Sequence, residues 1–148
     1  MFYLIKLFLR FCSIKTGGFF LIGITLFVLT SACSPTMQPR YSTEIDVTMV
    51  DYGYQPAQWR VPAGTDILIH ATNEGDFQHD WILLANPYTQ PYDQDDIEST
   101  IFSLSVNPGE SKTGEFKTPL APGEYDVICG QPGHAEKGIV GKIIVIQP

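Results

Sequence analysis

The sequence predicts an all-β fold, a sandwich or barrel of about 105 residues that spans positions 44–148. Short apolar or alternating runs recur throughout this part of the chain, and clusters of Gly, Pro, Asn and Asp separate them. No segment has the helical periodicity over about ten residues that a stable helix needs. The total length of 148 residues suits one domain and is short for two.

The predicted strands follow one another at short intervals. In the first, Ile45, Val47 and Met49 alternate with mostly polar neighbours, which is the period-2 pattern of a half-buried strand. Residues 66–72 are apolar enough for a central strand. The other predicted strands cover residues 59–61, 80–84, 101–106, 114–117, 124–129 and 140–146.

The longest predicted loop covers residues 86–100, which contain two prolines and a cluster of acidic residues. It shows no periodicity, and we expect at most one helical turn, around residues 95–100. The acidic side chains would steer a basic protein partner, or they form an ordinary solvated loop. These side chains are Asp93, Asp95, Asp96 and Glu98.

Residues 1–32 form a predicted export signal. Basic residues and no acidic one precede an apolar run from Phe19 to Leu29, and small residues then lead into Cys33. This pattern resembles the lipobox of bacterial lipoproteins, in which the cysteine is lipidated and becomes the new N-terminus. Thr30 stands where Leu is usual in that family, and an uncleaved N-terminal anchor is the alternative. In both cases a tether, residues 33–43, would hold the domain at a membrane and facing the periplasm or the cell exterior.

The chain is acidic, with nine Lys and Arg residues against 16 Asp and Glu residues and a formal net charge of −7. All of the acidic residues follow Cys33, but only six of the basic residues do, so removal of the signal would leave a charge of about −10. Such a domain repels nucleic acid and anionic membrane surfaces and attracts basic proteins. The charge therefore argues against nucleic-acid binding.

Cys129 is the only cysteine in residues 44–148, so an exported domain has no intrachain disulfide to form. A buried free thiol that packs as a small hydrophobe would account for it. However, Tyr125, Val127 and Cys129 alternate along a strand and share one face, which we expect to point inward. The Gly-rich turn 130–133 would then bring His134 back beside the sulfur atom.

A thiolate and an imidazole that converge on one point suit copper or zinc. His79 could supply a third ligand, because it begins a predicted strand directly after a loop. The remaining histidine, His70, lies within a strand away from both motifs, and we expect it to be structural.

These motifs together resemble the cupredoxins, or blue copper proteins. The resemblance rests on Cys-x4-His with Pro-Gly before the His, on the preceding Gly-x-Tyr-x-x-x-Cys strand and on a distant His that opens a strand. It covers residues 44–148 and implies a cupredoxin-like Greek-key β-sandwich. It also implies one mononuclear type 1 copper held by His79, Cys129 and His134. A carrier of this family would pass single electrons to or from redox partner proteins, such as a c-type cytochrome or a terminal oxidase or reductase.

Two positions depart from the family pattern. Ile139 stands where related chains place an axial Met, and isoleucine has no donor atom. We therefore expect a three-coordinate copper, with a backbone carbonyl near Gln78 as a weak axial contact, and a raised reduction potential. Asp80 stands where Asn is common. An ionised Asp80 would accept hydrogen bonds without donating any and would favour Cu(II), or it faces solvent and has no influence.

The exposed ring edge of His134 is the expected electron port, because this residue lies on a loop. An apolar docking rim would form around it from Pro132, Gly133 and Ile139. Trp81 could extend this rim, but core packing explains its position better.

An enzymatic role would need more ligands than this sequence offers. Copper oxidases and nitrite reductases resemble several cupredoxin domains together and carry His-x-His pairs, whereas this chain has three histidines and no such pair. A binuclear copper centre needs a second loop cysteine, and none follows Cys129. We therefore expect an electron carrier without self-contained catalysis. A lipoprotein for copper sequestration or delivery would use the same ligands and is the main alternative, and a metal-free adhesion domain is the third.

Overall fold

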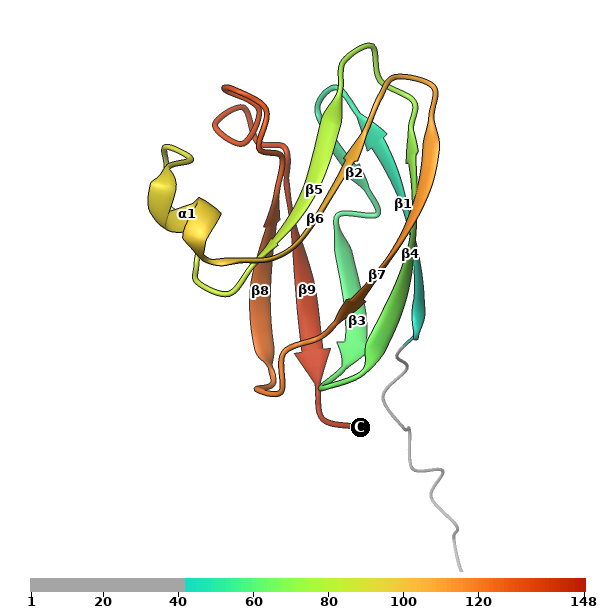
Figure 1. Ribbon diagram of the computed structural model, residues 1–148, viewed down its shortest axis with the longest axis vertical. Helices are drawn as coiled ribbons and strands as arrows, with labels where there is room; N and C mark the ends of the chain where they lie inside the picture. Colours follow the sequence, from blue (N-terminus) through green and yellow to red (C-terminus); the bar gives the residue numbers. More distant parts are fainter. Residues whose placement is uncertain (1–41) are drawn as a thin grey trace, which may run out of the picture. The chain divides into compact units, whose positions relative to one another are not determined.

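The computed structural model describes residues 42–148, so the predicted export signal, Cys33 and most of the predicted tether lie outside the described residues. Nine strands and one short helix follow one another in this part of the chain (Figure 1). No helix within it combines the length and the hydropathy of a membrane span. The elements are β1 (Glu44–Val50), β2 (Gly53–Gln55), β3 (Gln58–Pro62), β4 (Asp66–Asn73), β5 (His79–Leu84), α1 (Gln94–Glu98), β6 (Thr100–Val106), β7 (Ser111–Lys117), β8 (Gly123–Ile128) and β9 (Val140–Ile146).

The strands form two sheets packed as a sandwich (Figure 1). The strand order is β2-β1-β4-β7 in one sheet and β3-β9-β8-β5-β6 in the other. β1 pairs in parallel with β4, and β3 pairs in parallel with β9, while the remaining pairs among the described strands are antiparallel. The predicted all-β sandwich is confirmed.

Alternating side chains fill the space between the sheets. Ile45, Val47 and Met49 of β1 are all buried, as their period-2 spacing predicts. Trp81 lies at the centre of this core, fully buried, and its ring packs edge-on against Trp59 with the ring centroids 5.7 Å apart. The indole of Trp81 therefore belongs to the core and forms no part of a docking rim.

β5 is buried along its entire length, from His79 to Leu84. One face, with Trp81 and Leu83, contacts the core between the sheets. The opposite face, with Ile82 and Leu84, packs in a second cluster with Ile128 and Ala135 under the tyrosines of the loop before α1. Because both faces of β5 are covered, the strand that begins at His79 is held on two sides.

The sequence prediction misses β2 and starts β7 at residue 114 rather than 111. β2 is only three residues long, so its pairing with β1 leaves no periodicity to detect. The first three residues of β7 are polar and exposed, and only their ladder to β4 makes them a strand.

The acidic loop contains the one helical turn that the sequence predicts, although α1 begins and ends slightly earlier. The Asp93 side chain accepts hydrogen bonds from the backbone N–H groups of Asp95 and Asp96, and the Asp96 side chain accepts one from the N–H of Asp93. This reciprocal cap satisfies N–H groups that a helix start leaves free. Two of the four acidic residues thus cap α1, and the steering of a basic partner by this loop stays a prediction.

Replacement of Leu83 by Ala should lower the free energy of unfolding by about 2–5 kcal/mol, because the deletion leaves a cavity in a close-packed core. Urea unfolding followed by circular dichroism would measure the loss. Leu120→Ala is the matched control, since Leu120 is 81% exposed and its truncation should change stability by less than about 0.5 kcal/mol. Equal effects of the two substitutions would contradict this account of the core.

Candidate metal centre

The start of β5 and the loop between β8 and β9 lie at the same end of the sandwich, and they carry His79, Cys129 and His134 (Figure 1). His79 is the first residue of β5, and Cys129 directly follows the last residue of β8. The antiparallel register of these neighbouring strands pairs Ile82 with Ile128, which places the start of β5 beside the end of β8. His134 lies in the turn that follows Cys129 and returns to its sulfur atom.

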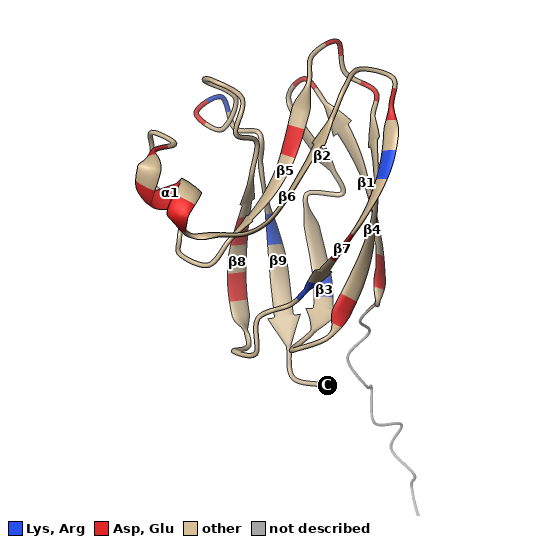
Figure 2. Ribbon diagram, viewed as in Figure 1, with Lys and Arg blue, Asp and Glu red and all other residues tan. Residues whose placement is uncertain are grey.

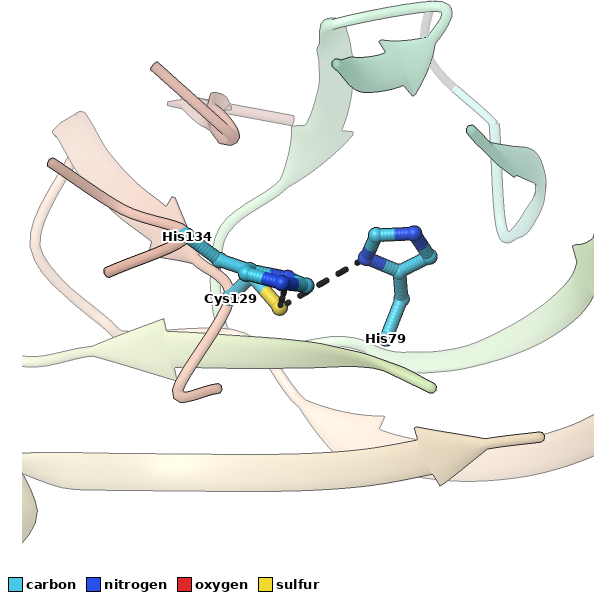
Figure 3. A group of neighbouring side chains, drawn as sticks. All are labelled: His79, Cys129 and His134. Carbon is cyan, nitrogen blue, oxygen red and sulfur yellow. Dashed lines mark hydrogen bonds between the residues drawn. The ribbon is translucent and has the colours of Figure 1, made fainter. Parts of the chain in front are cut away.

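The three side chains converge as the sequence predicts (Figure 3). Cys129 Sγ lies 3.5 Å from His134 Nδ1 and 3.8 Å from His79 Nδ1. One donor atom from each residue falls within 4.8 Å of the other two. The third histidine is elsewhere: His70 lies in β4, with its Nδ1 3.4 Å from Thr113 Oγ1.

This donor set fits a single copper ion. Transition-metal bonds to imidazole nitrogen and thiolate sulfur measure about 2.0 and 2.3 Å, so a trigonal arrangement separates sulfur from nitrogen by about 3.7 Å. The two observed separations of 3.5 and 3.8 Å bracket that value. Two imidazoles and one thiolate around a trigonal site are the ligands of blue copper centres.

The three residues are buried to different degrees. His79 and Cys129 are fully buried, whereas His134 is partly exposed. Burial raises the pKa of the Cys129 thiol, although hydrogen bonds from the backbone N–H groups of Asp80 and Gln131 partly oppose this. Burial, with help from the neighbouring His79 and from Lys137, lowers the pKa of His134. A lowered pKa keeps the His134 ring neutral near pH 7, which is the form that binds a metal.

The sequence matches the family described as cupredoxin-like domain over residues 20–145. This chain belongs to that family. No sequence among curated proteins matches it significantly.

Solved structures agree with the family assignment. Reduced auracyanin from Roseiflexus castenholzii is 25% identical, with a TM-score of 0.63 over 72% of this chain and 99% of that one. Auracyanin A, a "blue" copper protein from Chloroflexus aurantiacus, is 23% identical, with a TM-score of 0.56 over 70% of this chain and 99% of that one. Rusticyanin is 20% identical, with a TM-score of 0.53 over 72% and 80% of the two chains.

The predicted cupredoxin Greek-key fold is therefore confirmed, and the His–Cys–His group is able to bind one copper, as in auracyanin. A cupredoxin fold with such a group implies electron transfer.

Hydrogen bonds hold the ligand loop of this cupredoxin in place. The Asp80 N–H lies 3.4 Å from Cys129 Sγ and donates to the sulfur. The Cys129 N–H donates to the Ile139 carbonyl, and the Ile139 N–H donates in turn to the His134 carbonyl, both at 3.1 Å. The loop from Cys129 to Ile139 is thereby closed on itself, so the donor atoms of its two predicted ligands keep a fixed separation.

Ile139 is only 1% exposed and packs in the core cluster that contains Cys129. The expected docking rim is therefore wrong at this residue, because Ile139, directly before β9, is turned inward while Val140, the first residue of β9, is exposed. Pro132 is exposed, and Gly133 is partly exposed. Sequence analysis missed Phe77, which is 61% exposed and meets the His134 ring edge-on at a centroid distance of 6.4 Å.

Asp80 is buried, with an exposed fraction of 6%, so the alternative of a solvent-facing side chain is wrong. Its Oδ2 accepts a hydrogen bond of 2.9 Å from the side-chain amide of Gln131. Its Oδ1 is buried without a hydrogen-bond partner. Asp80 thus links the start of β5 to the loop that carries His134.

Asp51 contacts the other side of His79, which sequence analysis did not foresee. Its Oδ1 lies 3.3 Å from His79 Nε2. Desolvation by burial opposes the charge on Asp51, but hydrogen bonds from His79 and from the N–H groups of Asp76 and Phe77 outweigh it and lower the pKa of this carboxyl. No sequence signal points to Asp51, because it lies 28 residues before His79 in an ordinary turn.

Replacement of Gln131 by Ala should destabilise the protein by about 1–3 kcal/mol, because the buried Asp80 carboxyl then loses the one side-chain donor that it has among residues 42–148. Urea unfolding of the metal-free protein would measure the difference. The control is Gln78→Ala, which truncates an exposed glutamine beside His79 and should leave stability within about 0.5 kcal/mol of the parent. A Gln131→Ala variant as stable as this control would show that the link contributes nothing.

Proposed function

We propose that this protein is a one-electron carrier whose mononuclear type 1 copper is bound by His79, Cys129 and His134. The observation that carries the proposal is the meeting of these three donor atoms at one end of a cupredoxin sandwich. The proposal includes no self-contained catalysis, because the three histidines of the sequence form no His-x-His pair that could hold a second copper centre.

Copper bound there would supply a one-electron redox couple. The protein's part is to keep the surroundings of the donor atoms the same in both oxidation states. Full burial of His79 and Cys129 excludes water from them, and the two-sided packing of β5 prevents His79 from moving. A site that changes little between the two states costs little rearrangement energy, which favours fast electron transfer.

The route for the electron runs through His134. This ring is the one member of the group that reaches the surface, and the exposed Phe77 lies against it. A partner protein that docks on this end would meet an apolar ring and an imidazole edge. Figure 2 shows Asp and Glu residues on α1 and in loops at the same end, which favours a basic partner such as a c-type cytochrome.

Ile139 occupies the position where an axial methionine would donate, and its side chain adds an apolar wall in contact with the core around Cys129. Without a thioether donor, Cu(II) loses more stabilisation than Cu(I) does. A raised reduction potential is the consequence.

The domain is proposed to work outside the cytoplasm as a membrane-anchored lipoprotein that faces the periplasm or the cell exterior. The basic and apolar start of the sequence and the small residues before Cys33 support export and lipidation. The lone Cys129 is compatible with an oxidising compartment, because no second cysteine in residues 44–148 could trap it in an intrachain disulfide.

The copper-loaded soluble domain, residues 44–148, should show an intense thiolate-to-Cu(II) absorption band and reversible voltammetry. Cys129→Ser should abolish the band, since the band needs the thiolate, whereas His70→Ala should retain it, because His70 lies outside the group. A colourless oxidised protein would refute the proposal. A band without reversible cycling, combined with ready loss of copper to a chelator, would instead indicate copper delivery.

Ile139→Met should lower the reduction potential, because a thioether at this position stabilises Cu(II). The reduction potential should fall by about 59 mV for each tenfold increase in the ratio of Cu(II) affinity to Cu(I) affinity. Val140→Met is the matched control, as it adds the same thioether at the next residue, which faces outward. An unchanged or higher potential in Ile139→Met would rule out the axial argument.

A further inference from the structure

The imidazole of His79 is contacted at both of its nitrogen atoms. Nδ1 faces Cys129 Sγ, and Nε2 lies 3.3 Å from Asp51 Oδ1 (the sulfur side is drawn in Figure 3). A carboxylate can only accept a hydrogen bond, so the proton of the neutral ring sits on Nε2. The lone pair is then on Nδ1, the atom that points to the metal site.

The fold brings Asp51 to His79 through the parallel pairing of β1 with β4. Asp51 follows β1, and residues 74–78 connect β4 to His79. The pairing continues beyond β4, because the Glu74 N–H donates to the Met49 carbonyl at 2.9 Å. The Asp76 N–H then donates to Asp51 Oδ1 at 2.9 Å, which holds the carboxylate in position.

The connection between β4 and His79 is itself held by Asn73, which is fully buried. Its amide nitrogen donates to the carbonyls of Phe77 and Val106, and its amide oxygen accepts from the Gly75 N–H, all within 2.8–2.9 Å. These bonds hold the segment beside the Asp51 carboxylate. The contact between Asp51 and His79 therefore does not depend on a free surface loop.

Gly75 makes room for this contact. A Cβ at residue 75 would collide with Asp51 Oδ1 and would lie 3.0 Å from His79 Nε2 and 3.2 Å from the Asp51 backbone nitrogen. The backbone angle of Gly75 does not require glycine, since its φ lies outside the positive range. The missing side chain is thus explained by the close approach of the carboxylate and the imidazole.

We propose that Asp51 is a positioning residue that tunes the copper site through His79 by fixing its tautomer and adding negative charge behind the ring. The proposal rests on the proposed function, because it takes His79 to be a copper ligand. A carboxylate that accepts a hydrogen bond from the Nε2–H group makes the imidazole a stronger ligand to the metal through Nδ1. Both the stronger donor and the nearby negative charge favour Cu(II), so Asp51 offsets part of the rise in potential caused by Ile139.

The decisive variant is Asp51→Asn, which keeps the size of the side chain and an oxygen acceptor but removes the charge. Partners of metal-bound histidines contribute about 10–100-fold in metal affinity, and we expect the ratio of Cu(II) to Cu(I) affinity to fall about tenfold. That fall raises the reduction potential by about 59 mV. Gly75→Ala should also raise the reduction potential, because the new methyl group displaces the Asp51 carboxylate from His79. This variant keeps the negative charge of Asp51 in the chain.

Asp76→Asn is the matched control. It removes one negative charge from the same segment, but it keeps the backbone N–H that donates to Asp51, and the side chain is exposed. Its potential should shift much less, because solvent screens an exposed charge. Equal shifts in Asp51→Asn and Asp76→Asn would overturn the proposal, as would an unchanged potential in Asp51→Asn with the thiolate band intact.

The tautomer has a separate readout that needs no copper. Nitrogen-15 NMR of the metal-free parent should show the proton of His79 on Nε2, and Gly75→Ala should weaken its protection from solvent exchange. A proton on Nδ1 in the parent would overturn the proposal. A parent protein that lacks the thiolate band when copper-loaded would refute the proposed function instead, so the two failures are distinguishable.

Discussion

The antiparallel register of β5 against β8 determines where His79 lies relative to Cys129, and with it the geometry of the metal site. Pairing of Ile82 with Ile128 sets the start of one strand opposite the end of the other, and this places Cys129 within reach of the Asp80 N–H. A shift of one residue would turn Cys129 from the core between the sheets to the opposite face. A shift of one residue in β5 would likewise turn Trp81 and Leu83 out of the core between the sheets, so core packing and the metal site favour the same register.

Much of this arrangement is local in sequence and was therefore predictable. The spacing of Cys129 and His134 around a Gly-Pro turn fixes their approach within one loop, and the alternation of Val127 with Cys129 fixes the inward direction of the thiol. The contribution of His79 followed from the family resemblance and from its place at the start of a strand. Burial of Ile139 was not predicted, because the sequence analysis assigned this residue to an exposed docking rim.

The parts that sequence analysis missed depend on contacts between distant segments. Asp51 and His79 are 28 residues apart, and only the parallel pairing of β1 with β4 brings them together. Gln131 and Asp80 are 51 residues apart and meet because of the β5–β8 register. Neither contact has a spacing or a composition that marks it. Buried polar partners of this kind depend on the fold as a whole. The reason for a glycine at position 75 is likewise visible only in three dimensions.

The directions of the first and last strands determine at which end of the sandwich a linker can be attached. β1 runs from Glu44 toward the metal site, and β9 runs from the site toward Ile146, so both enter or leave the sandwich at the far end (Figure 1). The seven residues of β1 separate Glu44 from Val50 by roughly 20 Å. A linker or another protein joined at either end of the described domain is therefore attached at the end of the sandwich opposite His134.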